Sequence, residues 1–397
     1  MMLEEIIQLD KKYYMNTFGD RLPVCFEKGE GLKLIDDKGN TYYDFLGGIA
    51  VNALGHGHKD FIAALKNQLD KVIHTSSLYY IENQAKLAQK LAESTCAEKV
   101  FFANSGAEAN EGAFKLARKY FYKQGVEKYE IITLDKSFHG RTLATVAATG
   151  QEKYQKPYRP LTPGFKQVEP NNFEAVENAV TDKTAAIMIE LIQGESGVHP
   201  MDKEYVQKLR KLCDEKDIIL IFDEVQTGMG RTGHLFAHQM YGIEPDIFTS
   251  AKALGGGIPI GAVCAGKKVA DTFEPGDHGT TFGGNPFATA AGLAVFDIYE
   301  KEHLVENAAK MGEYFEEKLN ALKDKYADKI TDVRCAGLLI GIQIKDDIAK
   351  AVFNKLFESG ILTSLCGGNT IRIAPPLIIK ENDVDMFVNE LDKVLEG

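Results

Sequence analysis

The sequence contains no tryptophan, and none of its six cysteines forms a CxxC pair. A zinc site or a disulfide framework needs closer spacing, so we expect reduced and mostly buried thiols. Basic residues are also in the minority, 46 against 57 acidic ones, and the formal net charge is −11. An acidic surface attracts neither nucleic acid nor an anionic membrane, so neither is an expected partner.

Long apolar stretches are missing as well. No run approaches the roughly 18 residues that a membrane span needs. The first residues, MMLEEIIQLDKK, place acids early and hold only a short apolar run, which does not suit a signal peptide. These absences predict a soluble, cytoplasmic protein, and 397 residues suffice for one large domain and a smaller one.

From residue 100 onward, short β-branched runs alternate with helical patterns. Strands are expected at 100–103, 130–134, 185–191, 218–222, 246–250 and 260–265. Helices are expected between them, at 107–121, 173–180 and 205–215. This alternation is typical of an α/β protein whose mainly parallel sheet is covered by helices.

The ends of the chain carry a second set of expected elements. Before residue 100 these are strands at 32–35 and 41–45, flanking a hairpin signal, and helices at 59–73 and 82–93. A long helical tract over 286–326 is followed by strands at 333–344, 361–365 and 370–373 and helices at 348–358 and 384–395. We expect an N-terminal segment (1–55), a large domain (56–300) and a C-terminal part (301–397), with both termini forming a smaller α/β domain.

Two expected strands end in groups of opposite charge. Asp223 follows 218–222, and Lys252 follows the apolar run 246–251. Because the carboxyl ends of parallel strands open onto one crevice, the two groups should lie near each other. A lysine there is costly unless it is paired or converted to an imine. The pair is therefore either a buried ion pair or the two ends of a site for an aromatic carbonyl cofactor, whose ring nitrogen a carboxylate keeps protonated.

Two further segments favour the cofactor. In FANSGAEAN, 102–110, a strand ends in small residues before a helix, which suits a phosphate at the helix N-terminus. A simple N-cap by Asn104 or Ser105 is the alternative. In SFHGRT, 137–142, Phe138 can stack on a planar ring and Arg141 can bind a carboxylate, unless they are merely a core and a surface residue. Together with the acid and the lysine, these segments predict pyridoxal phosphate.

Three other motifs are weaker. GMGRTG, 228–233, formally matches the dinucleotide fingerprint, but four residues separate it from its strand, so we expect a glycine-rich loop. An NAD-dependent oxidoreductase built on Gly228–Gly233 is the alternative function from another class. GAVCAGKK, 261–268, lacks the Ser/Thr of a phosphate-binding loop and starts within an apolar strand. His56 and His58 have no further ligands at metal spacing, so no metal is expected.

These segments together resemble the class III (subgroup II) aminotransferases, which have fold type I, over essentially the whole chain. The arrangement DEVQTGMGRTG…DIFTSAKALGGG is similar to the lysine signature of that family. Within the family, the segments 48–52, 104–110, 138–145 and 148–154 are most similar to acetylornithine aminotransferases. The resemblance implies a homodimer that binds pyridoxal 5'-phosphate, with amino-acid and 2-oxo-acid substrates.

The implied reaction is transamination of N2-acetyl-L-ornithine with 2-oxoglutarate, which gives N-acetyl-L-glutamate 5-semialdehyde and L-glutamate in arginine biosynthesis. Ornithine, succinylornithine and 4-aminobutyrate aminotransferases are the alternatives within the family.

The resemblance also implies a role for individual residues. For the cofactor, Lys252 binds it covalently and moves the catalytic proton, and Asp223 pairs with the ring nitrogen. The remaining cofactor contacts are Val225 and Phe138 on the two ring faces, Gln226 near the ring hydroxyl, Gly106 and Ala107 at the phosphate, and Thr281 at the phosphate of a neighbouring subunit.

For the substrates, the resemblance assigns two arginines. Arg141, with Thr280 nearby, binds the α-carboxylate of the acylated substrate, and Arg372 binds that of glutamate or 2-oxoglutarate. Glu195 neutralises Arg372 while the first substrate is bound and then swings away, since an unpaired buried arginine is expensive.

Overall fold

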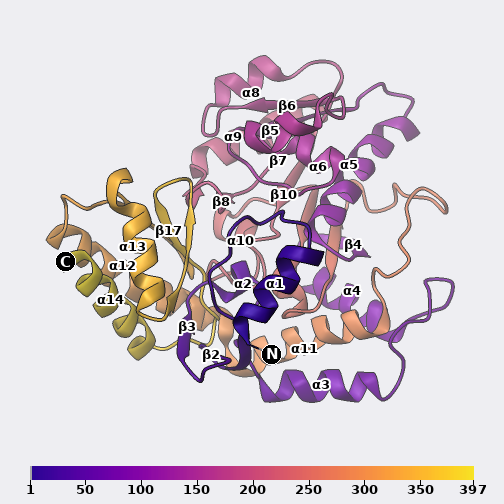
Figure 1. The fold of residues 1–397 in the computed structure, drawn as a ribbon. Helices are drawn as coiled ribbons and strands as arrows, with labels where there is room; N and C mark the ends of the chain where they lie inside the picture. Colours follow the sequence, from indigo (N-terminus) through magenta and orange to yellow (C-terminus); the bar gives the residue numbers. More distant parts are fainter. Residues whose placement is uncertain (1) are drawn as a thin grey trace.

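A computed structural model describes residues 2–397. Its centre is a seven-stranded sheet in the order β4-β12-β11-β10-β7-β5-β6 (Figure 1). The strands are β4 (Ala97–Ala103), β5 (Glu130–Leu134), β6 (Phe165–Val168), β7 (Thr184–Ile189), β10 (Ile219–Asp223), β11 (Ile247–Ser250) and β12 (Gly261–Gly266). Only β12 runs antiparallel to its neighbours among the pairs of this sheet. The expected mainly parallel sheet is confirmed.

The inner strands β7 and β10 are buried at every position and mostly apolar, because both faces of the sheet are covered. Successive side chains of a strand point to opposite faces. Ile219 and Ile221 of β10 thus join one core cluster, whereas Leu220 and Phe222 join the other. The bounding helices are α3 (Lys59–Leu69), α4 (Glu82–Ser94), α5 (Gly106–Lys123), α6 (Leu143–Ala148), α7 (Glu152–Gln155), α8 (Phe173–Ala179), α9 (Lys203–Lys216), α10 (Ala237–Tyr241) and α11 (Pro286–Glu302).

The helical tract expected over 286–326 is two helices. α11 ends at Glu302, and α12 runs over Leu304–Lys325. Between them His303 takes a left-handed conformation with φ of 51°. Helix α11 packs on α3 and α4, whereas α12 packs on the C-terminal elements, so the break at His303 separates helices that pack on different parts of the molecule.

The C-terminal part has its own four-stranded sheet, in the order β13-β14-β17-β16. The single strand expected at 333–344 is a hairpin of β13 (Ile330–Ala336) and β14 (Leu339–Ile344). It turns at Gly337, whose φ is 54° and where a Cβ would lie 2.4 Å from the backbone of Thr232. The other elements are α13 (Asp346–Glu358), β16 (Ser364–Cys366), β17 (Thr370–Ile373) and α14 (Glu381–Glu396).

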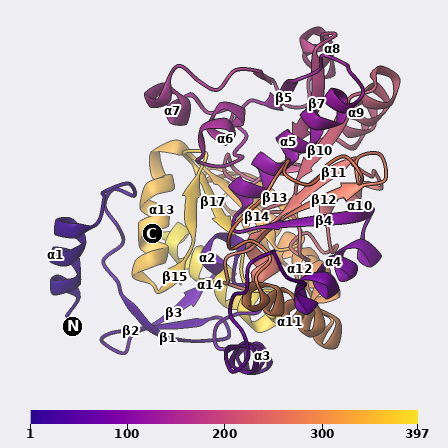
Figure 2. The ribbon, with the colours of Figure 1, turned by 90° about the vertical axis from the view of Figure 1, so that its right-hand side faces the viewer.

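The N-terminal strands form a sheet with a strand from the far end of the chain. β1 (Phe26–Glu30), β2 (Lys33–Asp36) and β3 (Thr41–Asp44) are antiparallel neighbours, and β15 (Ile361–Leu362) pairs parallel to β3. The helix α1 (Leu3–Tyr13) lies at the edge of the molecule and buries no residue (Figure 2). The boundaries at residues 55 and 300 stay predictions.

Small pairs and turns complete the described chain. β8 (Ile192–Gln193) and β9 (His199–Pro200) pair with each other, α2 (Gly47–Ala50) is a short kinked turn, and η1 and η2 cover Lys156–Tyr158 and Lys252–Gly255. Within residues 2–397, no helix is both long and apolar enough to cross a membrane.

Candidate active site

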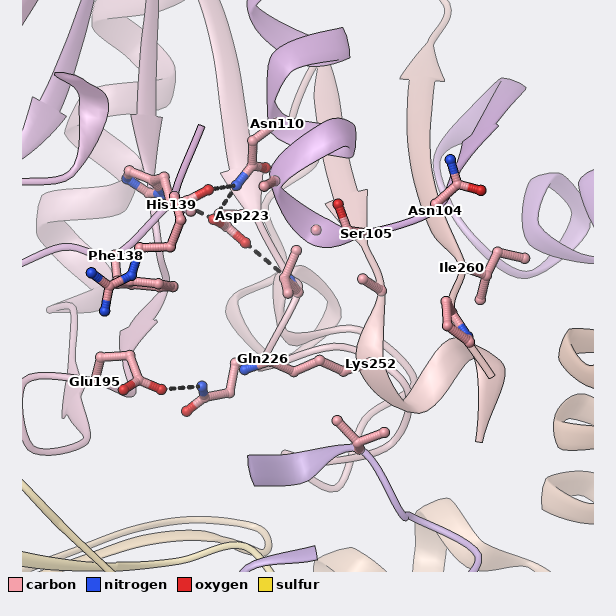
Figure 3. Close-up of a pocket in the computed structure, with 18 of the residues that line it drawn as sticks. Asn104, Ser105, Asn110, Phe138, His139, Glu195, Asp223, Gln226, Lys252 and Ile260 are labelled. Carbon is pink, nitrogen blue, oxygen red and sulfur yellow. Dashed lines mark hydrogen bonds and ion pairs between the residues drawn. The ribbon is translucent and has the colours of Figure 1, made fainter. Parts of the chain in front are cut away.

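The carboxyl ends of β4, β7, β10 and β11 meet at a cavity of about 410 Å³ (Figure 3). This is where ligands bind in open α/β sheets. Residues from six separate parts of the chain line it, which brings together most of the expected site. The expected residues on its wall are Gly106, Ala107, Phe138, Arg141, Glu195, Asp223, Val225, Gln226 and Lys252.

Asp223 is the last residue of β10 and is 4% exposed. Its Oδ1 accepts the Val225 backbone N–H at 3.0 Å. Its Oδ2 lies 2.8 Å from Nδ1 of His139 and accepts the Asn110 side-chain amide at 2.8 Å. Three donors therefore hold the carboxylate in one orientation at the cavity wall.

Asn110 is itself fixed by the sheet beneath it. Its carbonyl oxygen accepts the Thr249 hydroxyl at 2.7 Å, and its amide also donates to the backbone oxygen of His139 at 2.8 Å. Because both ends of the amide are bound, it cannot flip and can only donate to Asp223. The network Thr249–Asn110–Asp223–His139 thus joins β11, α5 and β10.

Lys252 lies two residues after the end of β11 and has a φ of 48°, a strained backbone conformation for a residue with a side chain. Burial lowers the pKa of its amine from 10.5 to about 8, the Arg372 charge acts in the same direction, and nearby carboxylates oppose both. A larger fraction of the amine is therefore neutral and nucleophilic near neutral pH. Among the ion pairs of the described chain none joins Lys252 to Asp223, so the alternative of a simple buried pair does not hold.

The start of α5 forms another wall. Gly106 and Ala107 are its first residues, and Ser105 caps it by accepting the Glu108 N–H at 3.2 Å. Ser105 thus caps the helix while the positive helix end faces the cavity, and the phosphate role of Gly106 and Ala107 stays a prediction. A Cβ at Gly106 would lie 2.7 Å from the Val225 side chain, so the space between these two residues requires glycine.

Glu195 and Arg372 form a nearly buried ion pair. The Arg372 Nη1 donates to Glu195 Oε1 at 2.6 Å and to Gln226 Oε1 at 3.2 Å, while the Gln226 amide donates to the same carboxylate oxygen at 3.1 Å. Burial raises the pKa of Glu195, but the charge and hydrogen bond of Arg372, together with Lys252 and Gln226, outweigh it and the net pKa is lowered. Arg372 belongs to β17 and does not itself line the cavity, whereas its partner Glu195 does.

Thr280 and Thr281 lie outside the cavity wall. The Thr280 hydroxyl accepts the Asn104 side-chain amide at 3.2 Å, whereas Thr281 is exposed. Thr281 was expected to act in the site of a neighbouring subunit, and that role stays a prediction.

Glu190, which had no predicted role, also lines the cavity. It is 5% exposed, its Oε2 accepts the Phe138 N–H at 3.1 Å, and burial together with the Asp223 charge raises its pKa well above the ordinary value. Its signal was available, because it is an acid at the end of an apolar strand, as Asp223 is. Asn110 and Thr249 gave no such signal.

The weaker motifs have structural roles. Arg231, in the glycine-rich loop 228–233, is 1% exposed and donates to the backbone oxygens of Leu338 and Pro375. The buried Arg231 side chain occupies the interior of this loop, and no residue of the loop lines the site cavity. Both findings contradict the dinucleotide alternative. The 261–266 segment is the strand β12 and not a loop. His56 contacts Asp44 at 2.8 Å, and His58 caps α3.

Comparisons with known proteins agree over the whole chain. Residues 14–395 match the family model of the class-III aminotransferases. An acetylornithine aminotransferase of Caldanaerobacter subterraneus is 49% identical over 98% of this chain and 99% of its own. One of Methanocaldococcus jannaschii is 50% identical, with 99% and 98% covered.

Solved structures give the same result. An ornithine aminotransferase of Toxoplasma gondii superposes with a TM-score of 0.95 at 32% identity, covering 100% of this chain and 95% of that one. An acetylornithine aminotransferase of Elizabethkingia anophelis does so with 0.88 at 35% identity, covering 100% and 99%. The predicted fold class, fold type I, is confirmed, and the chain belongs to the class-III aminotransferase family.

Proposed function

We propose that this aminotransferase uses pyridoxal 5'-phosphate to move the δ-amino group of N2-acetyl-L-ornithine to 2-oxoglutarate, yielding N-acetyl-L-glutamate 5-semialdehyde and L-glutamate, as in arginine biosynthesis. The observation that carries the proposal is the pair of arginines around one lysine: Arg141 lies on the cavity wall with no ion-pair partner within residues 2–397, while Arg372 is shielded by Glu195. The acetylornithine aminotransferases among the relatives support it.

The cavity fits the cofactor. The helix end at Gly106 and Ala107 suits its phosphate, Asp223 suits its ring nitrogen, and the missing Cβ at Gly106 leaves room beside Val225. Phe138 and Val225 would enclose the ring, and Gln226 would approach its hydroxyl. Bound pyridoxal phosphate supplies a carbonyl that condenses with amines and a ring that accepts electrons. A solved ornithine aminotransferase of T. gondii is described with this cofactor at its active site.

The residues of the chain would then perform the proton steps. Lys252 Nζ is the base that takes a proton from the substrate carbon and returns it, because its lowered pKa leaves a neutral amine available. Asp223, held by three donors, would pair with the ring nitrogen of the bound cofactor. The Glu190 carboxylate accepts the Phe138 N–H and so holds the backbone of Phe138 at the cavity wall.

Two carboxylate sites explain how one cavity takes two substrates. Acetylornithine reacts at its δ-amine, so its α-carboxylate is far from the reacting carbon and would bind Arg141, with Thr280 nearby. Glutamate reacts at its α-amine, so its α-carboxylate must lie beside the reacting carbon and would bind Arg372. Glu195 has to leave Arg372 for this to occur, which makes Glu195 the residue that separates the two half-reactions.

We include a homodimer in the proposal. Leu78, Tyr79 and Phe282 are 86%, 68% and 61% exposed, and Phe282 is next to Thr281. Exposed apolar side chains gathered in this way mark interaction surfaces. A second copy covering them would receive Thr281 at its cofactor phosphate. The six free cysteines fit a reducing, cytoplasmic location.

The test is a comparison of kcat/KM for acetylornithine, succinylornithine, ornithine and 4-aminobutyrate with 2-oxoglutarate as acceptor. Acetylornithine should have the highest value. A clear preference for free ornithine would contradict the proposed substrate, and the absence of a visible cofactor absorption after reconstitution would contradict the cofactor. Sedimentation of the purified protein measures the proposed dimer.

A further inference from the structure

We propose that Tyr154 positions Arg141: its ring supports the guanidinium at the cavity wall and holds it ready for the substrate carboxylate. The inference rests on the proposed function, in which Arg141 binds the acylated substrate. It adds a residue that lies outside the cavity wall and determines how well this substrate, and not glutamate, is bound.

The contact is close and well oriented. Arg141 Cζ lies 3.9 Å from the centroid of the Tyr154 ring and 5.5 Å from that of Phe138. The two rings are 5.9 Å apart and inclined at 78°, so they form a corner around the guanidinium. A cation over an aromatic face is attracted to the ring electrons without being neutralised. The arginine therefore keeps its full charge for a ligand.

Tyr154 is itself held in place from both sides of its helix. The Gln151 amide donates to the Ser137 backbone oxygen at 3.0 Å, next to Phe138. The Gln155 amide donates to the Thr149 backbone oxygen at 2.8 Å. The short helix α7 is thus tied to both ends of the segment that carries Arg141, which fixes the backbone of Tyr154 relative to that segment.

The two arginines of the site are therefore controlled in opposite ways. The charge of Arg372 is neutralised by the Glu195 carboxylate, which has to move before a substrate can bind. The charge of Arg141 stays available, because the Tyr154 ring contacts the guanidinium without neutralising it. Arg141 is largely exposed, so without support its long side chain would sample many conformations. Holding it in one of them lowers the ordering cost when the carboxylate binds.

The experiment compares holoenzyme variants Tyr154→Phe, which keeps the ring, and Tyr154→Leu, which removes it. We expect Tyr154→Leu to raise KM for acetylornithine about 3- to 30-fold, the range that a cation–π contact supports. The Ki of N2-acetyl-L-norvaline, which has the carboxylate but no δ-amine, should rise by the same factor. Tyr154→Phe should match the wild type in both, and the single-turnover rate with glutamate should stay unchanged in both variants.

Equal effects of the two variants, or an equal loss in both half-reactions, would overturn the inference. Tyr154→Met replaces Tyr154→Leu if the leucine variant does not fold, since it also lacks a ring. The wild-type kinetics alone decide the proposed substrate. The ratio between the variants decides the role of Tyr154, whichever carboxylate-bearing amine the wild type prefers.

Discussion

Nδ1 of His139 lies 2.8 Å from Oδ2 of Asp223, and both side chains are buried. Together with Asn110 and the Val225 N–H, this histidine fixes the acid that faces the proposed ring nitrogen. His139 immediately follows Phe138, so one short loop both covers the ring and orients its acid.

Replacing His139 by asparagine should weaken cofactor binding. A hydrogen bond to a charged group is worth about 1.5–3 kcal/mol, which corresponds to roughly 10- to 100-fold in affinity. The Kd for pyridoxal phosphate can be measured from the visible absorption during titration of the apoenzyme. His234→Asn, at an exposed histidine away from the cavity, is the matched control. An unchanged Kd in His139→Asn would show that Asp223 is oriented without the histidine.

Replacing Lys252 by alanine should abolish covalent attachment of the cofactor and turnover. Borohydride reduction followed by mass spectrometry should show the added mass of the cofactor in the wild type and none in Lys252→Ala. Lys267→Ala, at an exposed lysine, should behave as the wild type. Retention of the adduct in Lys252→Ala would assign the attachment to another amine.

The rate of cofactor attachment should depend on pH through the same lysine. Burial lowers the pKa of Lys252 to about 8, so its neutral, reactive form increases as pH rises, is half-maximal near pH 8 and approaches saturation about one pH unit higher. An ordinary lysine, with its pKa at 10.5, would instead keep gaining reactivity beyond pH 9. Stopped-flow absorption after mixing apoenzyme with pyridoxal phosphate distinguishes the two curves.

Replacing Glu195 by glutamine should shift substrate preference. A glutamine cannot neutralise Arg372, so a buried, unpaired positive charge remains while acetylornithine is bound. We expect the ratio of kcat/KM for acetylornithine to that for glutamate to fall by at least about tenfold, given the cost of an unpaired buried charge. Glu204→Gln, on the exposed face of α9, is the control. A parallel loss with both substrates would mean that Glu195 acts in chemistry and not in selection.

The stability of the large sheet should depend on a second buried acid and histidine. Glu224 Oε1 lies 2.8 Å from His238 Nδ1. Burial alone would lower the pKa of His238, but its hydrogen bonds to Cys96 and Glu224 raise it from 6.5 to about 9. A raised pKa means that the native state binds the proton more tightly, so this stabilisation is complete below pH 6.5 and is lost as pH rises towards 9. Urea unfolding across this range should show the loss.

His238→Ala should be less stable than the wild type by about 3–5 kcal/mol below pH 6.5, because it leaves a buried carboxylate unpaired. It should also lose the pH dependence, whereas His234→Ala should keep it. A wild-type free energy of unfolding that rises from pH 6.5 to 9 would contradict the assignment.

The sequence was most informative where an apolar strand is followed by a charged residue. Asp223 and Lys252 could be placed together because each follows an apolar run, and the edge at which parallel strands end is shared. Glu190 offered the same signal and was overlooked. Asn110 could not be assigned a role in this way, because a polar residue on a helix usually faces solvent, and only the packing of α5 on β10 and β11 turns it inward.

The boundaries that were wrong lacked strong local signals. The helical tract breaks at His303, where the sequence has no glycine or proline that would predict a break. The segment 333–344 reads as one apolar run because the β13–β14 hairpin has apolar residues on both sides of Gly337. The edge strand β6 is only partly buried and was missed altogether. Arg372 was located by resemblance alone, since a single arginine in a short strand has no pattern of its own.

The pairing of β15 with β3 has a consequence for synthesis of the chain. Tyr43 is opposite Ile361, so the N-terminal sheet stays incomplete until nearly the whole polypeptide has left the ribosome. Pairings between such distant residues form late, and an unpaired strand edge can associate with other chains in the meantime. The nascent chain therefore carries an open β3 edge for most of its synthesis, and truncation before residue 361 leaves that edge permanently uncovered.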